Sequence, residues 1–515
     1  MPNTYRDSVY LMKLSSQACK ESGALRISAM MGSARNKELF RDSGLSTPDV
    51  ERANADDLVI AVRAEQSLAD AAVEHVKALL EQAPARPASC GSMASMPHDL
   101  AGALELDPRL DLAVISVAGE YARYEAALAL ASGMDVMLYS DNISLEDELA
   151  LKTAAARKKL LVMGPDCGTA IIHGVPLAFA NRVNRGGIGL IAASGTGLQE
   201  VTCLLDRFGA GVSQAYGTGG RDLKDDIGGL TTLAALDRLL EDEDTRFIGI
   251  LGKPPGARVR VSLAERLRHC GKPAAVHYLG ADEYEIEDQA GILHAGNLTD
   301  FSLLLARKNG IEARLDSLEP PLPDAAGGRM RGLFSGGTLC QEAAELAAPL
   351  LRGERCSNLA IAGFRHAAPG QSGEFGQAGC GHAFWDFGAD EFTVGRPHPM
   401  MAPELRMEHL VRELRDPGRA VILLDLVIGY GAAAGQAELV VAALEEAACL
   451  SPESSREKIV VASVCGTEKD TPPRSASVAV LRAGGVLVLE SNARAAVWAA
   501  RAVAETTARA VGRAS

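Results

Sequence analysis

Two kinds of hydrophobic pattern divide the chain. Near the N-terminus, residues 8–16 (SVYLMKLSS), 24–31 (ALRISAMM) and 57–63 (DLVIAVR) predict short strands. Apolar residues at helical spacing over residues 67–82 predict an amphipathic helix after them. We therefore expect residues 1–95 to form a small α/β unit with a ferredoxin-like arrangement.

Farther along, continuous apolar strands alternate with helices. A stretch rich in Pro, Ser and Gly at residues 83–97 predicts a linker before this part of the chain. Apolar runs such as LAVIS, VMLYS and LLVMG, separated by helical segments, indicate a parallel sheet covered on both faces. We assign residues 104–184 to an incomplete Rossmann-like domain.

The remainder of the chain contains an internal repeat. Residues 190–200 are LIAASGTGLQE and residues 332–342 are GLFSGGTLCQE, so each strand breaks into small residues and continues as Gly-Thr-x-x-Gln-Glu. Residues 236–251 match residues 410–425 as a helix, an acidic turn and a buried strand. Such a repeat predicts duplicated domains. We expect two tandem flavodoxin-like domains at 185–314 and 329–515, joined by a linker at 315–328.

Composition narrows the class of protein. A net charge of −14 argues against nucleic acid and against an anionic membrane surface as partners. The N-terminus has no apolar signal core, and acidic residues interrupt every apolar run before it could span a membrane. The ten cysteines form no Cys-x-x-Cys pair, which predicts free thiols and no metal site. We expect a cytoplasmic α/β protein.

The duplicated strand–helix corner suggests an anion site. A helix start leaves backbone N–H groups without partners, hydroxyl side chains can cap it, and the helix dipole favours negative charge. The alternative is a pair of ordinary helix caps with no ligand. Two copies at the same topological position favour one phosphate-sized group held between them. The expected phosphate or acyl-phosphate ligands are Ser194, Gly195, Thr196, Ser335, Gly336, Gly337 and Thr338.

Several segments also resemble a known family. The runs VISVAGEYA, LYSDNIS, LLVMGPDCGTAI and GIGLIAASGT resemble the α subunit of succinyl-CoA synthetase. MGSARNKELFRDSGL, FSGGTLCQEA and FWDFGADEFTVGRPHPMM resemble the FdrA family of acyl-CoA synthetase-like proteins, over nearly the whole chain. In the synthetases, helix starts from two ligase domains face a phosphohistidine. The resemblance implies that the duplicated corners are two halves of one phosphoryl site.

Three features depart from the synthetase pattern. No Gly-rich nucleotide loop leads into the Rossmann-like block, which argues against CoA as a cofactor. No Gly-His-Ala-Gly setting for a phosphohistidine follows GKPPGARV. The four blocks leave no room for an ATP-grasp domain, so ATP-driven ligation would need a separate subunit.

Further candidate residues come from polar segments near strand ends. In residues 381–401, His382 and His398 have the chemistry of acid–base groups, and Arg396 offers a planar fork for a carboxylate or phosphate. The alternative is an ordered surface loop in which these side chains pair with neighbouring acids. The other candidates, each with a structural alternative, are Arg221, Asp222, Lys253, Asp425, Thr467 and Asp470.

The leading hypothesis is a transferase that moves a carbamoyl or similar acyl group to or from phosphate. The resemblance to FdrA-type proteins implies it, because they resemble components of the oxamate carbamoyltransferase of purine and allantoin breakdown. Phosphate would be a co-substrate, with a small carboxylate or ureido acid as substrate and a homo-oligomer or partner subunits as the assembly. The first alternative is an ADP-forming acyl-CoA synthetase subunit working with an ATP-grasp partner. The second is a non-catalytic scaffold subunit.

Overall fold

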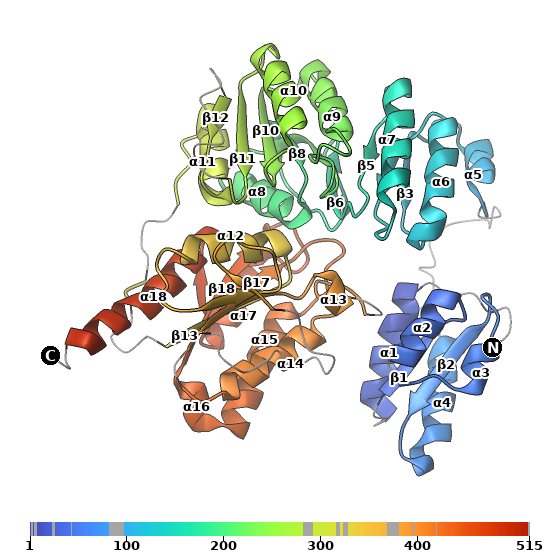
Figure 1. The fold of residues 1–515 in the computed structure, drawn as a ribbon, viewed down its shortest axis with the longest axis vertical. Helices are drawn as coiled ribbons and strands as arrows, with labels where there is room; N and C mark the ends of the chain where they lie inside the picture. Colours follow the sequence, from blue (N-terminus) through green and yellow to red (C-terminus); the bar gives the residue numbers. More distant parts are fainter. Residues whose placement is uncertain are drawn as a thin grey trace. The chain divides into compact units, whose positions relative to one another are not determined.

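A computed structural model gives the fold of the 515-residue chain. It describes residues 1, 4, 8–22, 26–42, 44–81, 97–281, 292–315, 320–322, 328–367, 381–393, 396–418 and 420–512. The expected linkers at 83–97 and 315–328 lie for the most part outside the described residues. The chain forms two compact units, one of Met1–Met96 with Asp390–Ala402 and one of Pro97–Ala389 with Pro403–Ser515 (Figure 1).

The N-terminal unit is an α/β structure, as expected. Its elements are α1 (Ser8–Ser22), β1 (Arg26–Met31), α2 (Ala34–Asp42), α3 (Pro48–Arg52), β2 (Leu58–Arg63) and α4 (Gln66–Glu81), with β1 antiparallel to β2. The strand predicted at residues 8–16 is wrong, because α1 occupies this segment. Leu11, Leu14 and Ala18 recur at helical spacing and pack in one cluster with residues of α4.

The next block alternates strands and helices. It contains α5 (Leu100–Leu106), β3 (Leu112–Ile115), α6 (Gly119–Ala131), β4 (Asp135–Leu138), α7 (Leu145–Lys158) and β5 (Val162–Met163). The three strands form a parallel sheet in the order β3-β4-β5. The sheet is not covered on both faces along its whole width, since Val114 of β3 is 53% exposed.

The first of the two flavodoxin-like domains, called the first ligase-like domain below because of the resemblance to the synthetases, has a seven-stranded sheet. Its elements are β6 (Thr169–Ile172), β7 (Val175–Ala178), β8 (Arg185–Ala192), α8 (Gly195–Arg207), β9 (Val212–Gly217), α9 (Leu230–Glu241), β10 (Phe247–Gly252), α10 (Ala257–Arg268), β11 (Ala274–Tyr278), β12 (Ile292–His294) and α11 (Leu298–Lys308). The strand order is β12-β11-β10-β8-β9-β6-β7. Strands β8 to β12 follow the flavodoxin-like order. Strands β6 and β7, which precede residue 185, add an antiparallel edge to this sheet.

The second ligase-like domain repeats this plan. Its elements are β13 (Arg329–Phe334), α12 (Gly337–Ala347), β14 (Arg355–Ser357), β15 (Arg365–His366), β16 (His382–Asp386), α13 (Asp390–Thr393), α14 (Glu404–Arg415), β17 (Ala420–Val427), α15 (Gln436–Leu450), α16 (Pro452–Arg456), β18 (Lys458–Cys465), α17 (Arg474–Ala483), β19 (Leu487–Leu489) and α18 (Asn492–Gly512). The parallel strands run in the order β15-β14-β16-β13-β17-β18-β19. Strand β16 takes the place that β9 has in the first copy. The expected fold class, with tandem flavodoxin-like domains, is therefore confirmed.

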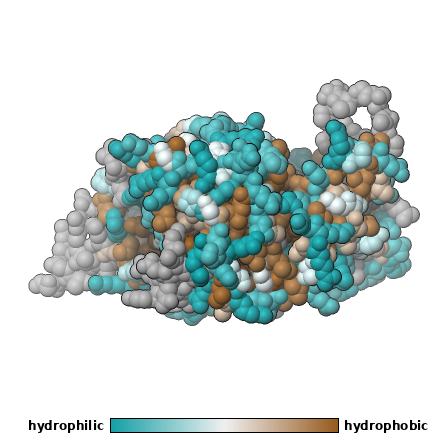
Figure 2. Space-filling view, turned by 90° about the horizontal axis from the view of Figure 1, so that it is seen from above, coloured by the Kyte–Doolittle hydropathy of each residue, from teal (hydrophilic) through white to brown (hydrophobic). Residues whose placement is uncertain are grey.

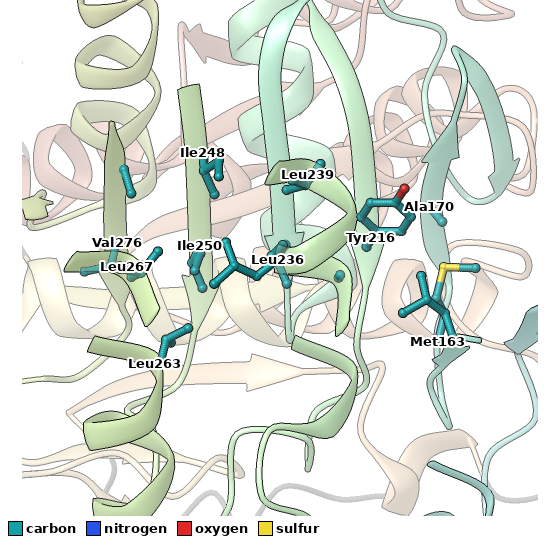
Figure 3. Packing of buried hydrophobic residues seen from close by; sticks show 14 of the residues in the cluster. Met163, Ala170, Tyr216, Leu236, Leu239, Ile248, Ile250, Leu263, Leu267 and Val276 are labelled. Atoms are coloured by element: carbon teal, nitrogen blue, oxygen red, sulfur yellow. The ribbon is translucent and has the colours of Figure 1, made fainter. Parts of the chain in front are cut away.

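Helices and strands of the first ligase-like domain share a continuous apolar core. Leu236 and Leu239 of α9 pack in one cluster with Ile248 and Ile250 of β10, as Figure 3 shows. The cluster extends to Met163 of β5, which ties the preceding block to this domain. This core holds together the strands whose carboxyl ends lead into the strand–helix corners.

The surface mixes polar and apolar residues. The face seen in Figure 2 interleaves hydrophilic with hydrophobic residues. Of the helices in the described ranges, not one combines the length and the apolar character that crossing a membrane requires.

One cysteine departs from the expectation of free thiols. Cys356 is disulfide-bonded, whereas Cys19, Cys167, Cys203, Cys270, Cys340, Cys449 and Cys465 are free. Burial raises the pKa of Cys167 to about 12 and raises that of Cys340, so neither is a ready nucleophile. The expectation failed at Cys356 because spacing along the chain does not show which cysteines the fold brings together.

Candidate functional site

The two duplicated corners are in contact. Helix α8 follows β8 and helix α12 follows β13, and Ser194 Oγ lies 2.5 Å from Thr338 Oγ1. A Cβ atom built on Gly336 would lie 2.8 Å from Thr196 Cγ2, so the approach requires a glycine at position 336. Both corners stand at the carboxyl ends of central parallel strands, where ligands of open α/β sheets bind.

The first corner keeps open hydrogen-bond donors. Ser194 is the N-cap of α8, and its Oγ accepts a 3.0 Å hydrogen bond from the N–H of Gly197. Within the part of the chain that the structure describes, the N–H groups of Gly195 and Thr196 have no acceptor. Gly195 is exposed and Thr196 is half-buried. An anion in front of α8 would therefore find free donors and the positive end of the helix dipole.

The second corner is already filled by a carboxylate. Asp425 of β17 accepts hydrogen bonds from the N–H of Ser335 at 2.8 Å, from Ser335 Oγ at 3.0 Å and from the N–H of Gly336 at 2.9 Å. The buried guanidinium of Arg406 donates from Nη1 to Asp425 Oδ1 at 2.6 Å. The backbone and hydroxyl donors of Ser335 and Gly336, expected to bind a ligand, are therefore occupied within the fold. Gly337 and Thr338 supply the remaining first-turn amides of α12.

Burial and ion pairing compete at Asp425. Burial raises the pKa of Asp425, while Arg406 and the donors of Ser335 and Gly336 lower it. Burial also lowers the pKa of Arg406, and Asp425 opposes that change. Each group thus favours the charged form of the other, and loss of either one would leave a fully buried partner without its ion pair.

A small cavity adjoins the first corner. Its volume is about 30 Å³, enough for a water-sized group. Its lining residues are Ala193, Ser194, Leu251, Gly252, Lys253, His277, Leu279, Leu298 and Thr338. Lys253, one of the strand-end candidates, is exposed and contributes positive charge here.

His277 lines the same cavity, although the sequence pattern did not single it out as a site residue. It is 3% exposed, and its Nδ1 lies 2.9 Å from the carbonyl oxygen of Ala295. Burial lowers the pKa of His277, which favours the neutral ring. Among the described residues, Nε2 has no hydrogen-bond partner. The available signal was one polar residue inside the apolar run AAVHY, which by itself does not distinguish a site residue from a core histidine.

A second buried polar atom lies near α8. Thr169 Oγ1 of β6 is buried and, within the described ranges, has no hydrogen-bond partner. It lies 3.5 Å from the position that a Cβ atom on Gly195 would take. A buried polar atom without a hydrogen-bond partner destabilises the protein, so a ligand or a water molecule that bonds to Thr169 Oγ1 would be stabilising.

The glutamates of the repeated motif also meet. Asn492, at the start of α18, donates from its N–H to Glu200 Oε1 at 3.2 Å and from Nδ2 to Glu342 Oε2 at 2.7 Å. Burial raises the pKa of both glutamates, that of Glu342 to about 7. The Gly-Thr-x-x-Gln-Glu repeat thus places hydroxyls at the open end of the contact between α8 and α12 and acids at its buried side.

Four further candidates serve as structural anchors. Asp222 accepts from Lys152 Nζ at 2.8 Å and caps α9 through the N–H groups of Thr231 and Thr232, and Arg221 pairs with Glu148. Asp470 accepts from Asn181 and from the N–H of Thr467, while Thr467 Oγ1 donates to the carbonyl of Arg182. These bonds join neighbouring blocks of the chain. Their donors and acceptors are used by the fold, and a site role for these four residues stays a prediction.

His382 is a structural residue as well. It begins β16, at the end of the strand opposite to the carboxyl ends where the corners lie. Its Nδ1 accepts from the N–H of Met330 at 3.1 Å, and its Nε2 lies 2.9 Å from the carbonyl oxygen of Arg352. Both ring nitrogens are occupied, and burial lowers the pKa of the ring. This bonding is typical of a structural histidine, and an acid–base role for His382 stays a prediction.

Arg396 and His398 belong to the other compact unit. The segment Asp390–Ala402 groups with the N-terminal residues. Burial lowers the pKa of Arg26, and the positive charge of Arg396 lowers it further. His398 Nδ1 accepts from the N–H of Met400 at 3.2 Å. Catalytic roles for these two residues stay predictions.

A second histidine was overlooked in the sequence. His294 ends β12 and is followed by Ala295 and Gly296, which gives three of the four residues of the Gly-His-Ala-Gly setting. The expectation that the setting is missing was too strict, because Leu293 replaces only its first glycine. His294 pairs in register with Val276 of β11, the strand that carries His277.

Comparisons with known proteins agree with this architecture. A model of the CoA-ligase family matches residues 333–502, and a model described as AllF, heavy metal-associated domain, matches residues 1–95. The α subunit of the ADP-forming succinate–CoA ligase of Aquifex aeolicus is 24% identical over 212 residues, which cover 40% of this chain and 66% of that protein.

Two solved structures are distant likenesses. The dinucleotide-forming acetyl-coenzyme A synthetase of Ca. Korarchaeum cryptofilum, in complex with phosphate and ADP, has a TM-score of 0.34 and 17% identity, covering 83% of this chain and 89% of that one. The ATP citrate lyase of Methanosaeta concilii, in complex with (3S)-citryl-CoA, has a TM-score of 0.36 and 15% identity, covering 44% of each chain. Neither likeness bears on the site.

A full-length relative defines the family. The uncharacterized protein YahF of Escherichia coli K12 is 39% identical over 502 residues, which cover 95% of both chains. The CoA-ligase match and the succinate–CoA ligase relative indicate an enzyme of the acyl-CoA synthetase-like type. They do not name FdrA itself. The chain therefore belongs to the family of YahF, within the acyl-CoA synthetase-like proteins that carry a CoA-ligase domain.

Proposed function

We propose that the two contacting strand–helix corners, here called the paired corner, bind the phosphoryl group of an acyl phosphate. We further propose that the chain is the acyl-transferring subunit of an ADP-forming acyl-CoA synthetase. The observation that carries this proposal is the 2.5 Å contact between Ser194 Oγ and Thr338 Oγ1, which brings two helix starts to one place. The open amides of Gly195 and Thr196 would hold phosphoryl oxygens, and Lys253 adds positive charge.

The internal carboxylate of Asp425 makes the site asymmetric. An anion would bind to α8 directly, whereas α12 contributes Thr338 and the amide of Gly337. In this reaction type, ATP would be used by a separate ATP-grasp subunit. His294, in its His-Ala-Gly setting, supports the same reading and is the residue we propose as phosphoryl acceptor, in place of His382 and His398.

Acyl transfer from acetyl phosphate to CoA tests this function. We expect the full chain to bind CoA in calorimetry and to form acetyl-CoA and phosphate. The double variant Thr196→Ala/Thr338→Ala should lower the rate at least about tenfold, because it removes a hydroxyl from each helix start. With acetyl phosphate and no CoA, transfer of the phosphoryl group to His294 with release of acetate should give a phosphohistidine that is labile in acid and stable in base. His294→Asn should not form it. His269→Asn, on an exposed part of the surface, is the control. Absence of CoA binding and of acetyl-CoA would overturn the proposal.

Carbamoyl transfer to phosphate is the second candidate. The turn between β3 and α6, residues 116–118, contains no glycine, and Gly119 begins α6, so the Rossmann-like block does not offer the Gly-rich loop that a nucleotide-type cofactor prefers. A phosphate site made from two helix starts could serve a ureido acid and phosphate directly. With the complete set of partner subunits, this function predicts phosphate-dependent formation of carbamoyl phosphate from oxalurate. Lack of that product would exclude it.

A non-catalytic scaffold is distinguished by the same variants. If Thr196→Ala/Thr338→Ala left both subunit assembly and turnover unchanged, the paired corner would have no catalytic part. Retained assembly with reduced turnover would instead support an active site.

A further inference from the structure

His277, which lines the cavity beside α8, has one ring nitrogen without a hydrogen-bond partner among the described residues. The carbonyl oxygen of Ala295 can only accept a hydrogen bond, so the Nδ1 of His277, 2.9 Å away, carries the ring proton. In the neutral ring, Nε2 then has a lone pair and no hydrogen. This nitrogen is buried and lacks a partner among the described residues. The ring lines the cavity together with Ser194 and Thr338.

The surroundings of this acceptor determine what could satisfy it. A water-sized group fits the cavity, and the exposed Gly195 directly follows its lining residue Ser194 in the chain. The free amides of α8 require acceptor oxygens, whereas His277 Nε2 requires an O–H or N–H. An oxyanion that carries one hydroxyl meets both requirements. A fully deprotonated oxyanion would place an oxygen lone pair against the lone pair of Nε2.

We propose that His277 makes the paired corner select oxyanions that bear a hydroxyl, inorganic phosphate above all, over fully deprotonated oxyanions such as sulfate. This selection rests on the proposed function, because it assumes an anion at the α8 corner. It adds the group that His277 recognises, the P–O–H of the inorganic phosphate released by acyl transfer, which the fully deprotonated acyl phosphate lacks. A phosphate at neutral pH always carries such a hydroxyl, whereas sulfate and selenate carry none.

Four inorganic anions test the selection in the full chain. Phosphate and sulfate form one comparison, and arsenate and selenate form a second with similar size and with the same difference in hydroxyl. We expect phosphate and arsenate to bind at least about tenfold more tightly than sulfate and selenate, which is the value of one good hydrogen bond. Calorimetry at neutral pH and fixed ionic strength gives the affinities.

Each outcome has a separate meaning. Equal affinities for all four anions would overturn the selection by His277 and leave the anion site in place. No binding of any of the four would overturn the anion site and the proposed function with it. Because these measurements use the wild-type chain, they do not depend on the folding of a variant.

A substitution at position 277 identifies the residue responsible. His277→Phe keeps a ring and removes the acceptor, so phosphate affinity should fall to that of sulfate while sulfate affinity stays the same or rises. His269→Phe, at the exposed end of α10, is the matched control and should keep the wild-type preference. A folded His277→Phe variant that still prefers phosphate would overturn the proposal.

Discussion

The two copies of the duplicated corner differ in what stands in front of the helix. In the match between residues 236–251 and 410–425, Leu251 occupies the position of Asp425. The strand registers agree, since Leu251 pairs with Ala192 at the end of β8, and Asp425 follows Leu424, which pairs with Leu333 near the end of β13. In the second copy the carboxylate of Asp425 takes up the donors of Ser335 and Gly336. In the first copy the N–H of Ala193, the equivalent of Ser335, donates to the carbonyl oxygen of Leu251 at 3.0 Å, and the Leu251 side chain lines a cavity. The N–H groups of Gly195 and Thr196 have no acceptor among the described residues.

This difference teaches how one motif can serve two purposes. The helix start favours a negative group in either copy. A chain that supplies the negative group itself gains a rigid corner, and a chain that supplies an apolar residue leaves the site to a ligand. The repeat therefore combines an internally neutralised corner with one that we propose to be the binding corner.

The largest effect is expected from removing the internal carboxylate. Asp425→Asn leaves Arg406 buried without its counter-ion, and loss of one partner of a buried ion pair costs about 3–5 kcal/mol of unfolding free energy. Urea unfolding measures this. Asp416→Asn is the control, because Asp416 pairs with Arg329 at a half-exposed position and should cost less than about 1 kcal/mol. Similar losses of unfolding free energy in the two variants would show that the buried ion pair of Asp425 stabilises the protein no more than the half-exposed pair of Asp416.

A smaller effect concerns the glutamates of the two copies. Burial raises the pKa of Glu342 to about 7, the donors of Asn492 and Leu298 oppose the rise, and Glu200 and Glu345 add to it. The folded state therefore holds a proton that the unfolded state releases above its ordinary carboxyl pKa. Stability should fall as pH rises from about 4.5 to 7, by up to about 3 kcal/mol from this group.

Unfolding of Glu342→Gln over this pH range checks the assignment. The variant should have a flatter stability profile than the wild type, because its side chain carries no proton to lose. Glu438→Gln, on α15, should keep the wild-type slope. An unchanged slope in Glu342→Gln would contradict a protonated Glu342.

Transplanting the carboxylate sharpens the comparison directly. Leu251→Asp places an internal anion near the start of α8, and it should lower phosphate affinity at least about tenfold by repelling the bound anion and competing for the positive end of the helix. Leu251→Asn is the matched control of nearly equal shape without charge, and it should retain more of the affinity. Calorimetric titration with phosphate gives both values. Equal losses in the two variants would mean that polarity or packing, and not negative charge, is responsible.

The smallest effect is expected from the bond between the copies. Thr338→Val keeps the shape of the side chain and removes the hydroxyl that meets Ser194 Oγ. The unfolding free energy should fall by about 0.5–1.5 kcal/mol, the usual net value of one hydrogen bond. Urea unfolding of Thr338→Val beside Thr338→Ser, which keeps the hydroxyl, separates the bond from the methyl group. A larger loss in Thr338→Ser would assign the effect to packing against Gly197.

Prediction from the sequence succeeded for features that depend on interactions between residues close together in the chain. Alternating apolar strands and helices, the repeat of Gly-Thr-x-x-Gln-Glu and the flavodoxin-like plan follow from hydrophobic period and turn chemistry. The same approach failed at residues 8–16, where a short apolar run suits a strand or a helix and only packing against α4 selects α1. It also left the role of His382 undecided, since a histidine beside glycines has the same sequence pattern whether its nitrogens are free or bonded.

By itself, the sequence determined that two equivalent helix starts exist and which small residues form them. Tertiary structure alone decided that Ser194 and Thr338 touch, that Asp425 fills one helix start, and that His277 faces the cavity beside the other. The physical reason is range. Helix period, capping and strand pattern act over a few residues, whereas the partner of a buried charge or the content of a cavity depends on segments far apart in the chain.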